Sequence, residues 1–148
     1  MPTYRCTVLE NRLSAEQKAR IASEVTRIHT DVTGAAGFFA QVIFEEVKPG
    51  NYFMGGAPLT HDQIFLFGVV RAGRATVDKT RMVKLMAASL CEASGVPMSG
   101  VWVYLGELPP RQMIEYGHVL PEPGDEAEWL AALSSDDRAF MQSVGKKR

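Results

Sequence analysis

Residues 63–70 read Gln-Ile-Phe-Leu-Phe-Gly-Val-Val and form an almost continuous apolar run. Such a run predicts a strand that is covered on both faces. The pattern that follows predicts a helix over residues 76–94, which ends at Gly95 because glycine readily takes the left-handed conformation of a helix C-terminus. Residues 100–106, which read Gly-Val-Trp-Val-Tyr-Leu-Gly, predict the next strand. This half of the chain therefore has the order strand, helix, strand.

The first half of the chain has the same order. Residues 2–9 are rich in strand formers, and residues 40–47 read as a further strand. Between them, Ser14 and Gln17 form a capping-box pattern, which predicts that a helix over residues 15–33 begins there. A β-α-β unit is thus written twice, over residues 2–47 and 62–106 of a single domain that spans residues 1–148.

The two units predict an α/β (α+β) architecture. A crossover of helix length implies parallel strands within each unit, and two units side by side give a four-stranded sheet with both helices on one face. The other face would be bare, yet the strands are too apolar to face water, so we expect a homo-oligomer that covers it. Residues 107–148 contain an expected short helix over residues 126–133 and are interpreted as a C-terminal arm, whose docking site the sequence does not indicate.

Composition argues against several functions. The net charge of −1 provides no positive field that would draw the protein to nucleic acid or to an anionic membrane. No apolar run approaches the ~20 residues that cross a bilayer, and the first residues lack the apolar stretch of a secretion signal, so we expect a cytoplasmic protein. Cys6 and Cys91 are too far apart for a metal motif, and we expect neither a metal nor another cofactor.

Three residues could act on a small acid. If Met1 is removed, Pro2 carries a free secondary amine that can serve as base, acid or nucleophile, although proline at this position is also common without any role. Arg71 and Arg74 stand where a strand ends and a helix is about to begin. Guanidinium donors and free backbone N–H groups suit a carboxylate there, and two solvated surface charges are the alternative.

Three further side chains could take part in the same chemistry. His29 lies within the first expected helix, where a structural role is more common than a functional one. Tyr104 is expected on the same strand face as Trp102, and a core aromatic residue without a function is the alternative. Glu115 stands among apolar neighbours, where desolvation can change the charge state of a carboxylate, and an exposed surface glutamate is the ordinary alternative.

Taken together, these residues carry a resemblance to a known family. Pro2, His29, Arg71, Arg74, Tyr104 and Glu115 stand in the order and spacing of the six active-site positions of the cis-3-chloroacrylic acid dehalogenase family, within the tautomerase superfamily. Longer stretches are similar too, among them Arg71-Ala-Gly-Arg74, Trp102-Val-Tyr-Leu-Gly-Glu-Leu-Pro and Gln112-Met-Ile-Glu-Tyr-Gly. The resemblance covers the chain from Pro2 to about Met141. It implies a β-α-β-β-α-β tautomerase fold assembled as a homotrimer.

The resemblance also implies a reaction. Arg71 and Arg74, helped by His29, would bind the substrate carboxylate, while Glu115 and Tyr104 would activate a water that attacks C3. Protonated Pro2 would deliver a proton to C2, so that a cis-3-haloacrylate yields malonate semialdehyde without a cofactor.

Two other functions are alternatives. An enol–keto tautomerase of the phenylpyruvate or oxalocrotonate type would use neutral Pro2 as a base, and a cytokine-like binding protein would not use the pocket at all. Phe38-Phe39, Tyr52 and Ala57-Pro58-Leu59 depart from the family pattern, which bears on specificity for cis-chloroacrylate.

Overall fold

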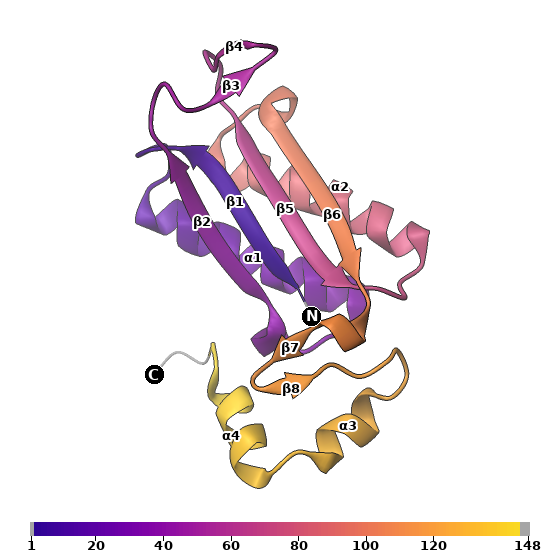
Figure 1. Ribbon diagram of the computed structural model, residues 1–148. Coiled ribbons are helices and arrows are strands. Elements are labelled where there is room, and N and C mark those ends of the chain that lie inside the picture. The colour runs from indigo at the N-terminus through magenta and orange to yellow at the C-terminus, as the bar shows by residue number, and fades with distance from the viewer. Residues whose placement is uncertain (1, 146–148) are drawn as a thin grey trace.

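The computed structural model of the chain describes residues 2–145, so the predicted removal of Met1 lies outside the described residues. Its centre is a four-stranded sheet in the order β2-β1-β5-β6 (Figure 1). These strands are β1 (Thr3–Leu9), β2 (Gln41–Val47), β5 (Ile64–Arg71) and β6 (Val101–Leu108). β1 runs parallel to β2 and β5 runs parallel to β6, as predicted, whereas the two units meet through an antiparallel β1–β5 pair.

The two long helices begin and end where the sequence predicts. α1 spans Ala15–Thr33 and α2 spans Thr76–Ser94. At the start of α1 the side chain of Ser14 accepts from the backbone N–H of Gln17 at 3.1 Å, and the Gln17 side chain accepts from the Ser14 N–H at 3.0 Å. Gly34 ends this helix with φ of 70°, a left-handed conformation in which glycine pays no steric penalty.

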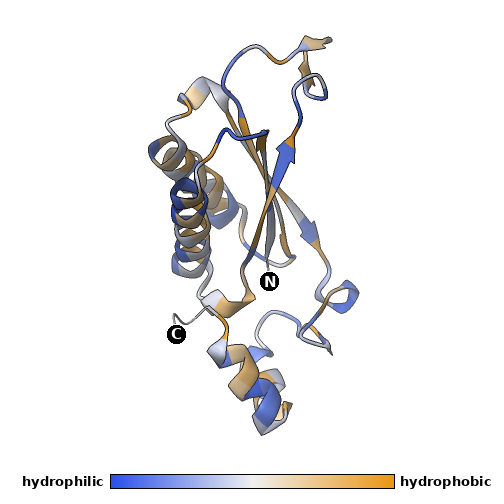
Figure 2. Ribbon diagram, turned by 90° about the vertical axis from the view of Figure 1, so that its left-hand side faces the viewer, coloured by the Kyte–Doolittle hydropathy of each residue, from blue (hydrophilic) through white to orange (hydrophobic). Residues whose placement is uncertain are grey.

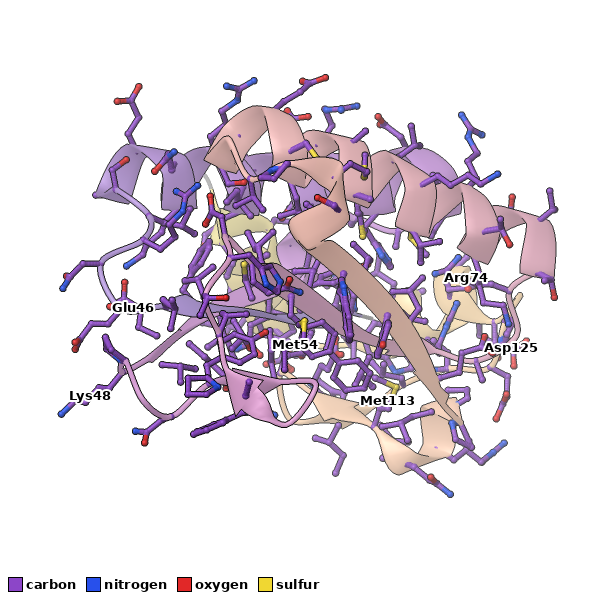
Figure 3. All side chains as sticks on the ribbon, turned by 90° about the horizontal axis from the view of Figure 1, so that it is seen from above. Glu46, Lys48, Met54, Arg74, Met113 and Asp125 are labelled. Atoms are coloured by element: carbon purple, nitrogen blue, oxygen red, sulfur yellow. The ribbon has the colours of Figure 1, made fainter. Side chains whose placement is uncertain are left out.

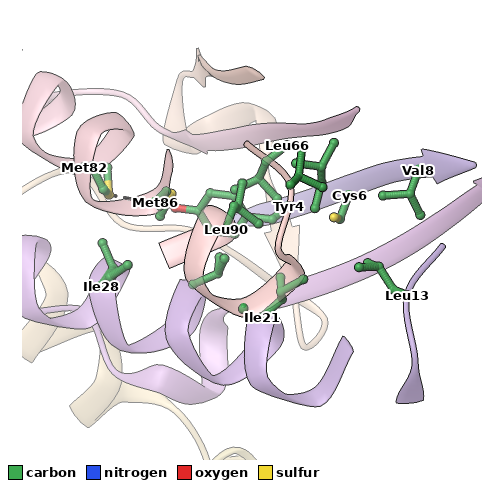
Figure 4. Packing of buried hydrophobic residues seen from close by; sticks show 14 of the residues in the cluster. Tyr4, Cys6, Val8, Leu13, Ile21, Ile28, Leu66, Met82, Met86 and Leu90 are labelled. Carbon is green, nitrogen blue, oxygen red and sulfur yellow. Dashed lines mark hydrogen bonds between the residues drawn. The ribbon is translucent and has the colours of Figure 1, made fainter. Parts of the chain in front are cut away.

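Both helices cover the same face of the sheet, as Figure 2 shows edge-on. Alternation along β1 directs Tyr4, Cys6 and Val8 toward the helices, and all three are fully buried. They pack against apolar residues of α1, α2 and β5 that include Ile21, Ile28, Leu66, Met82, Met86 and Leu90 (Figure 4). This single core lies between the sheet and the helix layer.

The opposite face of the sheet is not covered by the described chain. Its β1–β2 half is polar and carries the ion pair of Arg5 with Glu45, whereas its β5–β6 half is apolar. Here Trp102, Tyr104 and Leu108 of β6 are exposed, and Phe65 and Phe67 of β5 are half-buried. The expectation that residues 63–70 form a strand covered on both faces is therefore met on the helix side only. The reason is that both β-α-β crossovers place their helices on the same side.

Short elements extend both ends of the sheet. The hairpin β3–β4 (Phe53–Met54, Ala57–Pro58) projects beyond the start of β5 (Figure 1). After β6, the hairpin β7–β8 (Ile114–Glu115, His118–Val119) leads to α3 (Glu126–Ala132) and α4 (Ser135–Ser143), and the sequence predicted only α3 of these. Three 3₁₀ turns complete the described elements: Gly37–Phe39, Met98–Gly100 and Pro110–Gln112. Within residues 2–145, none of the helices is long and apolar enough to span a membrane.

Candidate active site

The topology of the sheet brings distant parts of the sequence together at one end. Because β1 and β5 are antiparallel, the start of β1 meets the end of β5, and Thr3 lies opposite Val69. The end of β6 lies at the same level, since Arg71 pairs with Leu108. The hairpin β7–β8 follows after the turn Pro110–Gln112 and lies at this end of the sheet (Figure 1), where its Glu115 lines the same cavity as Thr3 of β1. Five of the six predicted site residues come from these segments, from the loop between β5 and α2, and from the C-terminal part of α1.

Pro2 opens β1 at this end of the sheet. The residue is buried, and its carbonyl accepts a hydrogen bond of 3.0 Å from the backbone N–H of Gln41. This bond to β2 holds Pro2 in place. The next residue, Thr3, lines a cavity of about 630 Å³ together with Glu115, so Pro2 lies at the edge of that cavity. A free amine on Pro2 would be fixed in position by these constraints.

Arg71 is buried at the end of β5 and is bound by the C-terminal arm. Its Nη1 donates to the carbonyl oxygen of Pro121 at 2.9 Å, and its Nη2 forms an ion pair with Glu126 of α3. The Glu126 carboxylate also accepts from the backbone N–H of Gly124 at 2.8 Å. Arg71 thus anchors the arm against the end of the sheet, which answers the question of where the arm docks.

Arg74 lies just before α2 and is half-buried. Figure 3 places it at the opposite end of the molecule from Glu46 and Lys48. Its Nη1 makes a long contact of 3.4 Å to the carbonyl of Thr33 at the end of α1, and its buried Nε has no hydrogen-bond partner among residues 2–145. Burial and the like charge of Arg71 lower the pKa of Arg74 from its ordinary value. An anion would relieve both effects.

His29 lies on the buried face of α1 and is only 2% exposed. Its Nδ1 is hydrogen-bonded to the hydroxyl of Tyr4 at 2.8 Å, and its Nε2 has no partner within the described part of the chain. Burial and the charge of Arg74 lower the pKa of His29 to about 3, so the ring is neutral near pH 7. The histidine can act as a hydrogen-bonding group there but not as a cation.

Glu115 lies in β7. The next residue, Tyr116, fixes the hairpin β7–β8 against the rest of the chain. Tyr116 has φ of 53°, a left-handed conformation that is uncommon for a bulky residue, and its hydroxyl donates to the carbonyl of Phe38. Burial raises the pKa of Glu115, and the positive charge of the amino terminus and, to a smaller extent, that of Arg71 partly offset this rise. A carboxylate with a raised pKa is a better base than an exposed one.

Tyr104 does not join the other five residues within one copy of the chain. It lies in the middle of β6 opposite Phe67, on the bare face of the sheet, and it is 52% exposed. Its ring contacts those of Trp102 and Phe65 at centroid distances of 6.2 and 5.1 Å. The predicted shared face with Trp102 is confirmed, but this face points away from the side chains of Tyr4 and His29.

Two cavities flank this end of the sheet and share a wall of Phe38 and Phe39. The larger one contains Glu115, and the second, of about 410 Å³, contains Arg71 and Arg74. The cavity that contains Glu115 therefore adjoins the one that contains Arg71 and Arg74, across Phe38 and Phe39. Within residues 2–145, no group of three or more histidine, cysteine, aspartate or glutamate side chains is arranged to hold a metal ion.

The sequence did not indicate two residues that contact the predicted site. Tyr4 was part of a predicted strand, and alternation could have shown that it faces the helices, but nothing local pointed to His29. Glu126 lies far from Arg71 in the chain, and an acidic residue at the start of an expected helix is common for electrostatic reasons alone. Only the tertiary structure reveals both pairings.

Comparison with known proteins identifies the class to which this fold and site belong. Residues 1–133 match the model of the family Tautomerase_3, described as "Putative oxalocrotonate tautomerase enzyme". The duplicated β-α-β fold agrees with this match. The chain therefore belongs to the tautomerase superfamily, a superfamily of enzymes.

Solved structures narrow the relationship. The chain is similar to the crystal structure of N1, a member of the cis-3-chloroacrylic acid dehalogenase family, with a TM-score of 0.90, 29% sequence identity, and coverage of 96% of this chain and 99% of N1. It is similar in fold to a fused 4-OT trimer, with a TM-score of 0.73, 17% identity, and coverage of 79% and 94%. The resemblance stated from the sequence is confirmed, and the chain is a homologue of the cis-3-chloroacrylic acid dehalogenase family.

Proposed function

We propose that this protein adds water to short unsaturated carboxylates with a substituent at C3, including cis-3-haloacrylates, and that it does so without a cofactor. The observation that carries the proposal is the convergence of Pro2, Arg71, Arg74 and Glu115 at one end of the sheet. Two buried nitrogens at this site, Nε of Arg74 and Nε2 of the neighbouring His29, have no hydrogen-bond partner among the described residues. Unpartnered buried polar atoms are rare in folded proteins, and a bound carboxylate would satisfy them.

The charges at the site suit conjugate addition. When water attacks C3, negative charge grows toward the carboxylate. Arg71 and Arg74 would stabilise this transition-state charge more strongly than they stabilise the charge of the bound substrate. The ion pair with Glu126 and the bond to the Pro121 carbonyl hold the Arg71 guanidinium in one orientation. Arg74, whose Nε is unpartnered among residues 2–145, would make the direct contact to the substrate.

Glu115 and Pro2 would handle the protons. Glu115 would accept a proton from the attacking water as its oxygen bonds to C3, and the aminium group of Pro2 would give a proton to C2. With a cis-3-haloacrylate, the product carries both hydroxyl and halide on C3. It collapses to malonate semialdehyde as chloride leaves with the bonding electrons and the hydroxyl proton is released. Removal of Met1 is a condition of this mechanism, because an amide nitrogen on Pro2 has no basic lone pair.

We further propose that Tyr104 acts from a neighbouring subunit of a homotrimer. The residue lies on the exposed apolar face of β5 and β6, where a second copy of the chain would bury Trp102, Leu108 and the half-buried phenylalanines. Fused 4-OT structures of similar fold are trimers. In such an assembly Tyr104 of one subunit could approach Glu115 of the next.

Chloride release from cis-3-chloroacrylate tests the proposal, on protein whose mass shows that Met1 is absent. We expect release that falls about 100- to 10,000-fold in Glu115→Gln, because a general base typically contributes this much. The matched control is Glu46→Gln, which removes an exposed carboxylate paired with Lys18 at the other end of the molecule. Equal activity in the Glu115 variant and the control would refute the role of Glu115.

A second candidate is an enol–keto tautomerase in which neutral Pro2 is the base. The description of the matching family favours this reaction class. Ketonisation of phenylenolpyruvate by the same sample, without chloride release, would establish it in place of the first proposal.

A further inference from the structure

Tyr4 and His29 form a buried pair next to the candidate site. Tyr4 is fully buried in β1, and its hydroxyl lies 2.8 Å from Nδ1 of His29 in α1. The two rings meet edge to face, with centroids 6.0 Å apart at an angle of 71°. Such a contact fixes the imidazole plane as well as one of its nitrogens.

The hydroxyl of Tyr4 has one proton and two neighbours that could accept it. One is Nδ1 of His29, and the other is Sδ of Met82 in α2 at 3.9 Å (Figure 4). A thioether sulfur is a weak acceptor, whereas an unprotonated imidazole nitrogen is a strong one. The arrangement therefore favours donation from Tyr4 to His29, which leaves the ring proton on Nε2.

The far side of the imidazole supports the same arrangement. Nε2 is buried and has no hydrogen-bond partner within residues 2–145, as is also true of Nε of Arg74. A lone pair on Nε2 would repel a carboxylate, while an N–H at this position would donate to it. Two donors without partners would then face the same kind of ligand.

We propose that Tyr4 is a positioning residue, whose hydroxyl donates to Nδ1 of His29 and so holds Nε2 protonated as a donor to the substrate carboxylate. This inference rests on the proposed function, because it takes a carboxylate as the ligand. Burial raises the pKa of Tyr4 well above its ordinary value and lowers that of His29 to about 3, which keeps both groups neutral across the physiological range. The pair is then a fixed donor relay rather than a proton switch.

Nitrogen-15 NMR of the wild-type protein at pH 7 tests the tautomer directly. His29 is assigned by comparison with His29→Gln, since the chain has three histidines. We expect Nε2 to show the shift of a protonated ring nitrogen and Nδ1 that of an unprotonated acceptor. The reverse pattern would overturn the inference, whatever reaction the protein catalyses.

A double-mutant cycle tests the link to the carboxylate. The probe is 3-chloropropanoate, a saturated acid that cannot undergo the addition, and its Kd is measured by calorimetry. We expect Tyr4→Phe to raise this Kd about 2- to 12-fold, which corresponds to the loss of one hydrogen bond. In a His29→Gln background the same change should have no further effect, because Tyr4 acts only through His29.

The outcomes separate this inference from the proposed function. An equal effect of Tyr4→Phe in both backgrounds would mean that the hydroxyl does not act through His29, and the inference fails. If the wild-type protein releases no chloride, the proposed reaction is refuted. The NMR measurement of the His29 tautomer and the double-mutant cycle on Kd then still decide the role of Tyr4. If Tyr4→Phe does not fold, the NMR measurement on the wild-type protein still decides it.

Discussion

Replacement of Arg74 by methionine should abolish most activity while leaving the fold intact. The side chain makes one long contact of 3.4 Å to the Thr33 carbonyl, and its Nε has no partner among the described residues. Little native bonding is therefore lost. Burial and the charge of Arg71 both lower the pKa of Arg74, so the charged form is disfavoured where it stands. We expect the free energy of unfolding to stay unchanged or to rise by up to about 1 kcal/mol.

The effect on turnover should be much larger. A single well-placed donor to a developing oxyanion contributes about 3–4 kcal/mol, so kcat/KM for the unsaturated acid should fall by about 100- to 1,000-fold. The assay is chloride release, or ketonisation of phenylenolpyruvate if that is the observed reaction, with a thermal unfolding curve on the same sample. Arg81→Met is the control, because Arg81 is an exposed arginine of α2.

Two results would refute this reasoning. A loss of less than tenfold in a folded Arg74→Met protein would exclude Arg74 as a principal carboxylate ligand. A fall of more than about 5 °C in Tm would show that the arginine has a structural role that its contacts do not reveal. Arg71→Met provides a comparison. Because Arg71 also holds the arm through Glu126, its replacement should lower Tm as well as activity.

Three further predictions concern stability and the arm. Gly68→Ala should destabilise the fold by about 1–3 kcal/mol in urea unfolding, because its new Cβ would lie 2.5 Å from the ring of Tyr4; an unchanged midpoint would contradict the packing described. The folded pKa of His29 is about 3 against an ordinary value of 6.5, so its contribution to stability is complete above pH 6.5 and is lost as pH falls toward 3. His29→Gln should show a shallower acid dependence of stability over that window, and an identical dependence would exclude the histidine as its source. Glu126→Gln should speed amide hydrogen exchange in α3 but not in α1, because it breaks the ion pair with Arg71; equal exchange would mean that other contacts hold the arm.

The two long helices and the four strands of the main sheet could be predicted from local sequence. The bounds of α1 and α2 follow from Ser14, Gly34 and Gly95, because capping and left-handed termination depend on residues within one turn of the helix end. The parallel pairing within each unit follows from the length of the crossover. The hairpin β7–β8 and α4 were not predicted, since their segments are short and their stability depends on contacts with distant residues.

The sequence alone determined the two β-α-β units, their helix ends and the family resemblance, because each depends on residues that are near in the chain or on their order along it. Only the tertiary structure decided how the units meet. The antiparallel pairing of β1 with β5 brings Pro2 to the level of Arg71, and the same packing buries His29 against Tyr4. It also leaves Tyr104 on the opposite face. These placements come from pairing and side-chain packing between residues far apart in the chain, and no local pattern specifies them.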